Sequence, residues 1–279
     1  MNRRNFVKCA VAAAAAPASL AAQSTASAPN LPPLPPAGAD GWVSLINGRN
    51  LESFYTMLDK SGKGVAEKRG MVTFENGLLH IMGNLVTEEP QEPGYIATTR
   101  EFSNYHLRAE YKYGVKRFPP RVDMKRDNGI LYHLVGEDKV WPTCVECQVQ
   151  EGDTCDYFLL GGARGSAGRG GGYYGGRPTP ASGAPQPAPG QPPPVSNRKL
   201  RDQGGDFENR EGWNLVEVIV QEDRSVHILN GVRLNTMSGF EQPDPQNPGQ
   251  FIPLTRGKIA IEIEYAETWY RRLEIKSLA

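Results

Sequence analysis

Short apolar runs joined by Asn-Gly turns constrain the fold of this 279-residue chain more than any other feature. Asn76-Gly77 and Asn230-Gly231 each lie between two apolar runs, which is the pattern of a tight antiparallel hairpin. No segment of ten or more residues repeats its apolar positions with the period of a helix. The sequence therefore predicts an all-β fold in which two sheets pack face to face, a jelly-roll β-sandwich.

The stretch 127–158 contains two predicted strands with polar side chains on one face. In the second strand Glu146 and Gln148 alternate with apolar residues such as Cys147, so the carboxylate and the amide share a face. In the first strand the same alternation places His133 beside Glu146 if the two strands pair. Such a polar stripe suits a sugar-binding or acid/base groove, but an ordinary solvated sheet face has the same pattern.

The N-terminus has the features of an export signal. Arg3 and Arg4 precede a short Ala-rich run, which predicts a twin-arginine signal peptide over residues 1–28 and not a membrane span. Such a signal directs an already folded protein to the periplasm or the exterior. A Pro-rich spacer over 29–40 and a single sandwich domain over 41–279 are expected to follow.

The Gly- and Pro-rich segment 161–203 interrupts the pattern of strands. It has too few apolar residues to offset the entropy lost on ordering, so we expect a long mobile insertion in the domain. It is either a tolerated surface insertion or a lid beside the active face, in which Tyr173 and Tyr174 stack on a ligand.

The charge balance bears on the partners. The chain has 31 basic and 31 acidic residues, and loss of the three basic residues of the signal leaves 28 against 31. This slight negative excess argues against nucleic acid and anionic membrane surfaces as partners.

Three cysteines remain after the signal: Cys144, Cys147 and Cys155. An odd number cannot all pair within the chain, so a disulfide framework is not expected. Cys144 and Cys147 are three residues apart, and on a strand they face opposite ways, so they are not expected to chelate one metal ion.

Several motifs occur in a fixed order along the chain: GW-x-SLINGRNL, DNGILYH, WPTCVECQVQEGDTCDYF, HILNG and GKIAIEIEYAETWYRRLEIKSL. Together they resemble the 3-keto-disaccharide hydrolase family, over Gly41 to Leu278. The resemblance implies a jelly roll of the concanavalin A-like lectin/glucanase type and cleavage of glycosides oxidised to a ketone at sugar position 3. A non-catalytic carbohydrate-binding module and a conventional glycoside hydrolase, with Glu146 and Glu264 as its carboxylate pair, remain alternatives.

The chemistry of a 3-keto sugar defines what the site needs. The ketone acidifies the hydrogen at position 2, so a base can remove it, the aglycone at position 1 leaves by β-elimination, and water adds to the resulting enone. This reaction requires a base, an acid for the leaving oxygen, and an arginine, an amide or a divalent metal to stabilise the enediolate.

Glu146 and His133 are the predicted catalytic residues, and Gln148 is predicted to bind a sugar hydroxyl. His133, Glu146 and Glu151 are the candidate ligands if a divalent metal, calcium or a transition metal, takes part. A structural role for each of these residues is the alternative. Glu151 lies in an acidic turn where Cys155 replaces a glycine common in the family, which affects the geometry of that turn.

Five further residues are candidates for substrate binding. Glu110 and Lys112 share a strand face, and Trp141 lies in the loop before the Glu146 strand. Arg271 is predicted on the side of the last strand that carries Leu273, and the family resemblance places it in the groove. His227 occupies a position where the family often has histidine. Each also has a structural alternative. Glu110 and Lys112 could lie on a solvated sheet face, and Trp141 could anchor its loop. Arg271 could form an ion pair at the rim of the sandwich, and His227 could pack in the core.

Overall fold

The computed structural model describes residues 35–166, 173–175 and 197–278. All of them fall within one compact unit, Leu31–Ala279. The signal peptide predicted over 1–28 lies outside the described residues. No helix occurs among the described residues, so none of them forms a helical membrane span.

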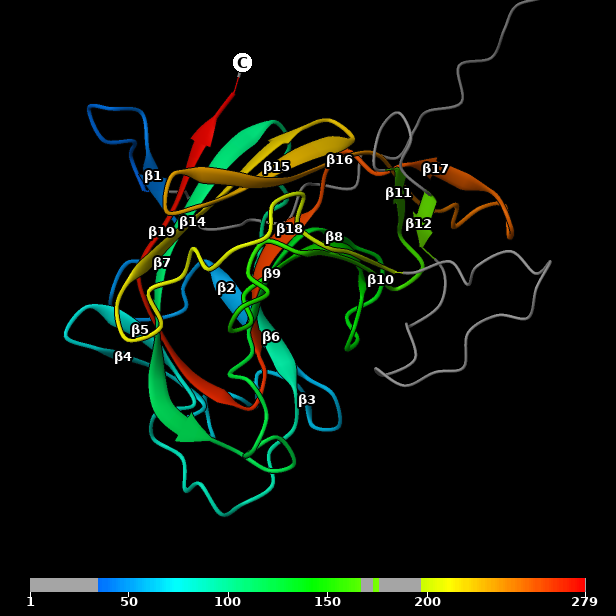
Figure 1. The fold of residues 1–279 in the computed structure, drawn as a ribbon. Helices are drawn as coiled ribbons and strands as arrows, with labels where there is room; N and C mark the ends of the chain where they lie inside the picture. The colour runs from blue at the N-terminus through cyan, green and yellow to red at the C-terminus, as the bar shows by residue number, and fades with distance from the viewer. Residues whose placement is uncertain (1–34, 167–172, 176–196, 279) are drawn as a thin grey trace, which may run out of the picture. The chain divides into compact units, whose positions relative to one another are not determined.

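The larger of two sheets has eleven strands in the order β12-β11-β16-β15-β14-β7-β19-β5-β4, with β1 on β19 and β17 on β16 (Figure 1). Its strands are β1 (Val43–Ser44), β4 (Val72–Glu75), β5 (Leu78–Ile81), β7 (Tyr105–Arg117), β11 (Arg164–Ser166), β12 (Tyr173–Gly175), β14 (Asn214–Gln221), β15 (Arg224–Leu229), β16 (Val232–Pro243), β17 (Phe251–Pro253) and β19 (Ala266–Ser277).

The smaller sheet has eight strands in the order β13-β10-β9-β8-β18-β6-β2-β3. Its strands are β2 (Phe54–Leu58), β3 (Gly62–Lys63), β6 (Gly94–Thr98), β8 (Gly129–Val135), β9 (Thr143–Gln148), β10 (Tyr157–Leu160), β13 (Arg198–Lys199) and β18 (Lys258–Ile263). Figure 1 shows β8, β9, β10 and β18 side by side.

Both predicted hairpins form. Asn76 and Gly77, between β4 and β5, have φ angles of 52° and 81°, and Asn230 and Gly231, between β15 and β16, have φ angles of 49° and 82°. Two successive residues with positive φ are what a type I′ turn requires, and asparagine and glycine adopt that conformation most readily.

The core lies between the two sheets, where alternate residues of each strand face inward. From β7 and β14 it receives residues such as Leu107 and Val218, and from β9 it receives Val145 and Cys147. A second, smaller apolar cluster, which includes Cys144, covers the outer face of the smaller sheet. Cys144 and Cys147 thus face opposite sides of β9, as predicted, and the three cysteines of the described residues are buried and unpaired.

The segment 161–203 was predicted to be a mobile insertion, and its described parts contain strands. β11 and β12 extend the larger sheet beyond β16, and β13 pairs with β10 at the edge of the smaller sheet. The remainder of the segment lies outside the described residues, as do the side chains of Tyr173 and Tyr174.

Candidate functional site

A groove of about 420 Å³ lies on the outer face of the smaller sheet. It is lined mainly by residues of β9, β10 and β18 and of the segments before β8 and β13. These residues are Arg121, Met124, Asp127, Trp141, Glu146, Gln148, Gln150, Phe158, Leu160, Asn197, Arg198, Glu262 and Glu264. Acidic, basic, amide and aromatic groups therefore meet in one cavity.

Glu146 and Gln148 face this groove because β9 is regular where they lie. Their neighbours Val145 and Cys147 point into the core, as the alternation predicts. The Oε1 atom of Gln148 accepts a hydrogen bond from the Val149 amide at 2.8 Å, so its NH2 group is the part suited to donate to a ligand.

Glu146 and Glu262 come together above Gly129. In the register of the sheet, β8 lies between β9 and β18, and Gly129 has no side chain to keep the two carboxyls apart. A Cβ atom on Gly129 would stand 2.9 Å from Glu146 Oε1 and 2.6 Å from Glu262 Oε2. The two oxygens are therefore at most 5.5 Å apart, the sum of these distances. Neither oxygen has a hydrogen-bond partner among the described residues.

Arg121 links two further carboxyls of the groove. Its Nη1 atom donates to Asp127 Oδ2 at 2.8 Å, and its Nη2 atom lies 2.9 Å from Glu264 Oε1. Gln150 donates to the same oxygen of Asp127 at 2.7 Å. This network fixes Asp127 and Glu264 beside the Glu146–Glu262 pair.

Burial changes the acidity of three of these carboxyls. Glu146, Glu262 and Asp127 are 4%, 2% and 5% exposed. Burial, reinforced by the charges of neighbouring carboxyls, raises the pKa of each group well above its ordinary value. A carboxyl of this kind holds its proton at a higher pH than a solvated one, which is the property required of a general acid.

Arg198 provides positive charge on the opposite side of the groove. Its guanidinium binds Asp156 Oδ2 through Nε at 2.9 Å and through Nη2 at 2.5 Å. The positive charge of Arg198 partly opposes the rise in the pKa of Glu146.

The chain matches one protein family over residues 41–276, that of the 3-keto-alpha-glucoside-1,2-lyase-like domain. It belongs to this family. The match agrees with the resemblance found in the ordered motifs and supports a carbohydrate-related function. No curated protein sequence matches the chain significantly.

Two solved structures are similar to this family member to different degrees. One from Parabacteroides distasonis, provisionally assigned as a glycosyl hydrolase, is 17% identical, with a TM-score of 0.51 and coverage of 86% of this chain and 95% of that one. The carbohydrate-binding module CBM66 from Bacillus subtilis is 8% identical, with a TM-score of 0.41 and coverage of 85% and 96%. The fold is a jelly roll of the concanavalin A-like lectin/glucanase type, as predicted.

The structure does not bring His133 to Glu146. A β-bulge interrupts the pairing of β8 with β9 between Tyr132 and Val135, and His133 itself has a φ angle of 52°. The bulge reverses the alternation, so the His133 ring lies near Phe240 in the interior, and its Nε2 atom lies 3.0 Å from the Glu222 carbonyl oxygen. Burial lowers the pKa of His133 to about 4.

His227 also lies between the sheets. Its ring stacks on Tyr157 with centroids 3.8 Å apart. Its Nδ1 atom lies 3.2 Å from the Cys155 carbonyl, and its Nε2 atom lies 3.0 Å from the Tyr132 hydroxyl. The structure thus gives His227 the core-packing position that the sequence left open, away from the lining of the groove.

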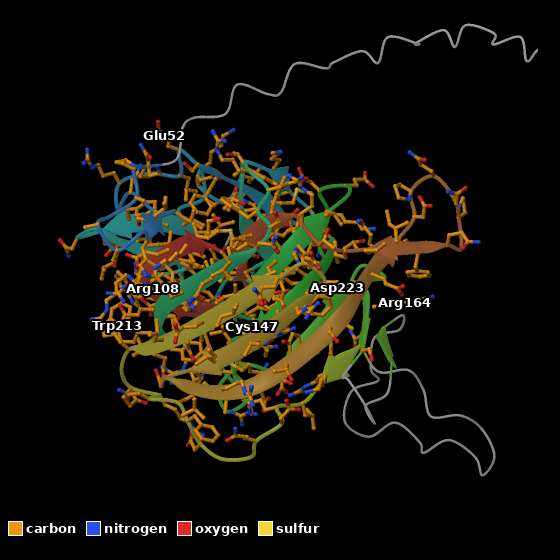
Figure 2. The ribbon with its side chains drawn as sticks, turned by 90° about the horizontal axis from the view of Figure 1, so that it is seen from above. Glu52, Arg108, Cys147, Arg164, Trp213 and Asp223 are labelled. Atoms are coloured by element: carbon orange, nitrogen blue, oxygen red, sulfur yellow. The ribbon has the colours of Figure 1, made fainter. Side chains whose placement is uncertain are left out.

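Glu110, Lys112 and Arg271 lie on the larger sheet, apart from the groove. Arg271 was predicted on the Leu273 side, but a bulge between Tyr270 and Arg272 turns it outward. There it binds Glu110 through Nε and Nη2 at 3.1 and 2.9 Å. The charged groups of Lys112 and Arg271 lie 5.6 and 4.5 Å from the centroid of a Trp213 ring. Figure 2 labels Trp213, which comes directly before β14, and Arg108, a residue of β7.

The three residues proposed to hold a metal are not assembled into a site. His133 faces the interior, Glu146 faces the groove, and Glu151 binds Arg126, with Oε1 2.6 Å from Nη2. Among the residues that the structure describes, no group of three or more histidine, cysteine or acidic side chains has the geometry to hold a metal ion. The set His133, Glu146 and Glu151 therefore does not fit a metal.

Cys155, the departure from the family pattern, has a φ angle of 78°. This conformation favours glycine, the residue that the family resemblance implies at this position. The adjacent turn is held by ion pairs of Glu151 with Arg126 and of Asp153 with Lys125.

Trp141 lines the groove, and its role in binding a substrate stays a prediction, whereas several other residues of the groove were not predicted. Asp127, Arg121, Arg198 and Glu262 were not singled out. The available signal was a pair of glutamates, Glu262 and Glu264, in an otherwise apolar strand.

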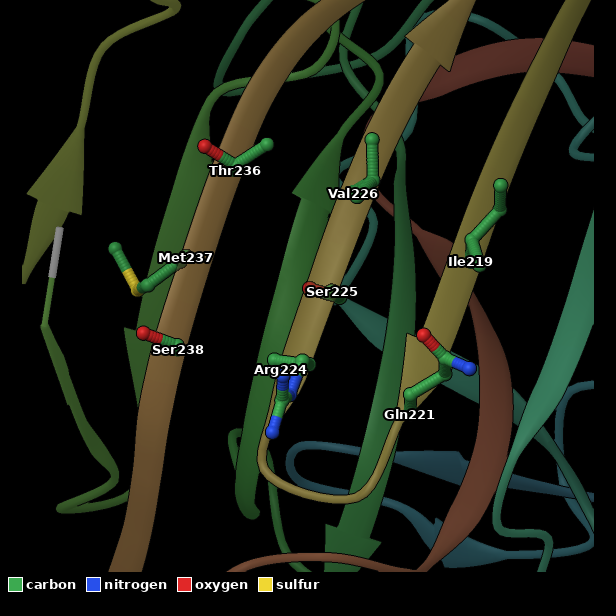
Figure 3. A pocket seen from close by; sticks show the side chains of 8 residues that line it. All are labelled: Ile219, Gln221, Arg224, Ser225, Val226, Thr236, Met237 and Ser238. Carbon is green, nitrogen blue, oxygen red and sulfur yellow. The ribbon is translucent and has the colours of Figure 1, made fainter. Parts of the chain in front are cut away.

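A second hollow, of about 260 Å³, lies over β14, β15 and β16 of the larger sheet (Figure 3). Its lining is apolar or neutral apart from Arg224, with residues such as Ile219, Val226 and Thr236. It contains no carboxyl group, so acid/base chemistry is better served by the groove on the smaller sheet.

Proposed function

We propose that this protein is an exported enzyme that cleaves 3-keto-glycosides by β-elimination and then hydration. The observation that carries the proposal is the pair of buried carboxyls, Glu146 and Glu262, whose unpartnered oxygens are at most 5.5 Å apart in a groove. Membership of the family supports the class of substrate.

In the elimination, one carboxylate of the pair removes the hydrogen at sugar position 2. The electrons of that C–H bond form the enediolate with the 3-keto group. The enediolate then re-forms the ketone, the bond from C1 to the aglycone oxygen breaks, and the second carboxyl protonates that oxygen. A pair in which one member holds a proton near neutral pH fits this division of roles, and the raised pKa values of Glu146 and Glu262 support it.

The enediolate needs a positive or hydrogen-bonding partner. We assign this role to Arg121, whose guanidinium is held in the groove by Asp127 and Glu264, beside the Glu146–Glu262 pair. The NH2 group of Gln148 is suited to bind a sugar hydroxyl.

In the hydration, water adds to C1 of the enone and a proton returns to C2. The two carboxyls reverse their roles, so the enzyme ends the cycle in its original protonation state. The sum of the two steps is hydrolysis of the glycosidic bond.

A non-catalytic carbohydrate-binding module and a conventional glycoside hydrolase are the competing functions. The converging carboxyls favour an enzyme over a binding module, because a buried unpaired acid destabilises the fold and acids of this kind cluster at catalytic sites. A conventional hydrolase that uses Glu146 with Glu264 as its carboxylate pair is disfavoured, because Glu264 forms an ion pair with Arg121.

The test is to incubate the purified mature protein with a glucoside and with its 3-keto derivative, with and without a chelator, and to measure aglycone release. We expect release from the keto sugar alone. Release from both sugars at similar rates would indicate a conventional hydrolase, and saturable binding without release would indicate a binding module. Loss of release on chelation would show that a metal takes part.

A further inference from the structure

The groove has two chemically different halves. Towards β18 and the segment before β8 it presents carboxyls, among them Glu262 and Asp127. Towards β10 and the loop before β9 it presents Trp141, Phe158 and Leu160. A ligand that fills the groove therefore contacts acid groups at one end and apolar surface at the other.

The register of the sheet fixes where the two halves meet. Phe158 on β10 pairs directly with Glu146 on β9, and Leu160 pairs with Cys144. Directly paired residues of neighbouring strands project to the same face, so the Phe158 ring stands next to the Glu146 carboxyl.

Packing against neighbouring residues holds the side chains of the apolar half in place. Trp141 and Leu160 pack against the cluster that contains Cys144, which holds them in place. The Arg198 guanidinium lies 5.2 Å from the centroid of the Phe158 ring and is itself bound to Asp156. Trp141, Phe158 and Leu160 nevertheless remain partly exposed to the cavity. Apolar side chains that are fixed and partly exposed beside buried acids are typical of a ligand subsite.

We propose that Trp141, Phe158 and Leu160 form the aglycone subsite, and that the preferred aglycones are aromatic. This inference rests on the proposed function, since it assigns the leaving group to the apolar half and the oxidised sugar to the acidic half. Two aromatic side chains and a leucine bind a planar ring through its faces and edges, whereas a methyl aglycone leaves this surface uncovered.

The kinetic test compares a phenyl and a methyl 3-keto-glucoside in each enzyme variant. The ratio of the two kcat/KM values contains the intrinsic difference between the leaving groups, but that difference cancels when the ratios of two variants are compared. We expect Phe158→Ala to lower the phenyl-to-methyl ratio about tenfold, which corresponds to the loss of one aromatic contact. Phe158→Leu, which keeps an apolar side chain, should lower the ratio less.

Phe251→Ala is the matched control, because Phe251 stacks on Arg164 and does not line the groove. Its phenyl-to-methyl ratio should equal that of the wild type. An unchanged ratio in both Phe158 variants would overturn the subsite.

A binding measurement keeps the two proposals separate. Calorimetric titration with unoxidised phenyl and methyl α-glucosides requires no chemistry, so it tests the subsite even if no keto sugar is cleaved. Tighter binding of the phenyl glucoside, reduced in Phe158→Ala, would support the subsite. Equal affinity for the two glucosides would refute it, whatever the outcome of the aglycone-release assay.

Discussion

The surroundings of Glu146 determine which protonation state its carboxyl favours. It lies on a regular strand, it is almost fully buried, and its Oε1 atom has no hydrogen-bond partner among the described residues. Burial of an unpaired carboxylate is costly in water-free surroundings, so the protonated form is favoured. Because Phe158 is its direct neighbour on β10, Glu146 is the member of the pair closer to the proposed aglycone subsite.

We therefore expect Glu146→Gln to lower kcat/KM about 1000-fold for a methyl 3-keto-glucoside, since a positioned acid contributes on that order. The loss should be smaller for a nitrophenyl aglycone, which leaves without protonation. The melting temperature should not fall, because glutamine removes a buried ionisable group. Glu52→Gln, at an exposed position, is the control. Equal losses for both aglycones would contradict the assignment of Glu146 as the acid.

His227 makes a prediction about stability and pH. Burial lowers its pKa to about 3 in the folded protein, whereas an unfolded chain binds the proton near pH 6.5. Between these values the unfolded state holds more protons, so the stability from this residue is complete above pH 6.5 and is lost as the pH falls toward 3.

In His227→Gln the fall in the free energy of unfolding below pH 6.5 should be shallower than in the wild type, by about 1.4 kcal/mol per pH unit. Urea unfolding at several pH values measures this difference. Parallel curves for the two proteins would show that His227 is not buried in the neutral form.

The same residues show how far the sequence predicts the site. The regular alternation of β9 correctly placed Glu146 and Gln148 on one face. The predicted strand faces of His133 and Arg271 were wrong, because each residue lies at a β-bulge. A bulge inserts one residue and reverses the faces of the residues that follow. A single sequence has no clear signal for such a bulge.

At the scale of elements, the site depends on which strands are neighbours. The hairpins and the all-β class follow from local turn chemistry, so the sequence predicts them well. The neighbours of β8 are β9 and β18, whose residues Glu146 and Glu262 are far apart in the chain. Long-range pairing of this kind has no local pattern, which is why the Glu146–Glu262 pair was not foreseen.

Gly129 on β8 allows this pair to form, because it has no side chain between the two carboxyls. In Gly129→Ala the new Cβ atom would stand less than 3 Å from both carboxyls and displace them. We expect kcat/KM to fall about 100-fold, the scale associated with a misplacement of about 1 Å, while circular dichroism shows a folded β protein. Gly204→Ala, with open space around the new methyl group, is the matched control. Full activity in the Gly129 variant would mean that the pair is not catalytic.

At the scale of the whole molecule, Arg3 and Arg4 lead to a prediction about export. Replacement of both by lysine keeps the charge but removes the twin arginine on which the proposed export signal rests. We expect the double variant to remain in the cytoplasm, which cell fractionation and immunoblotting would detect. Arg49→Lys, within the domain, should be exported normally. Export of the double variant would require another route.

The order of strands also determines when the protein can fold during synthesis. β18 lies between β8 and β6 in one sheet, and β19 lies between β7 and β5 in the other. A growing chain that ends before Lys258 therefore lacks an interior strand of each sheet, and Glu262 is missing from its site. Neither sheet is complete until β18 and β19 have been synthesised, so their neighbouring strands keep unpaired edges until then. The edges of β8, β6, β7 and β5 that β18 and β19 later cover are, until then, open to pairing with strands of other chains.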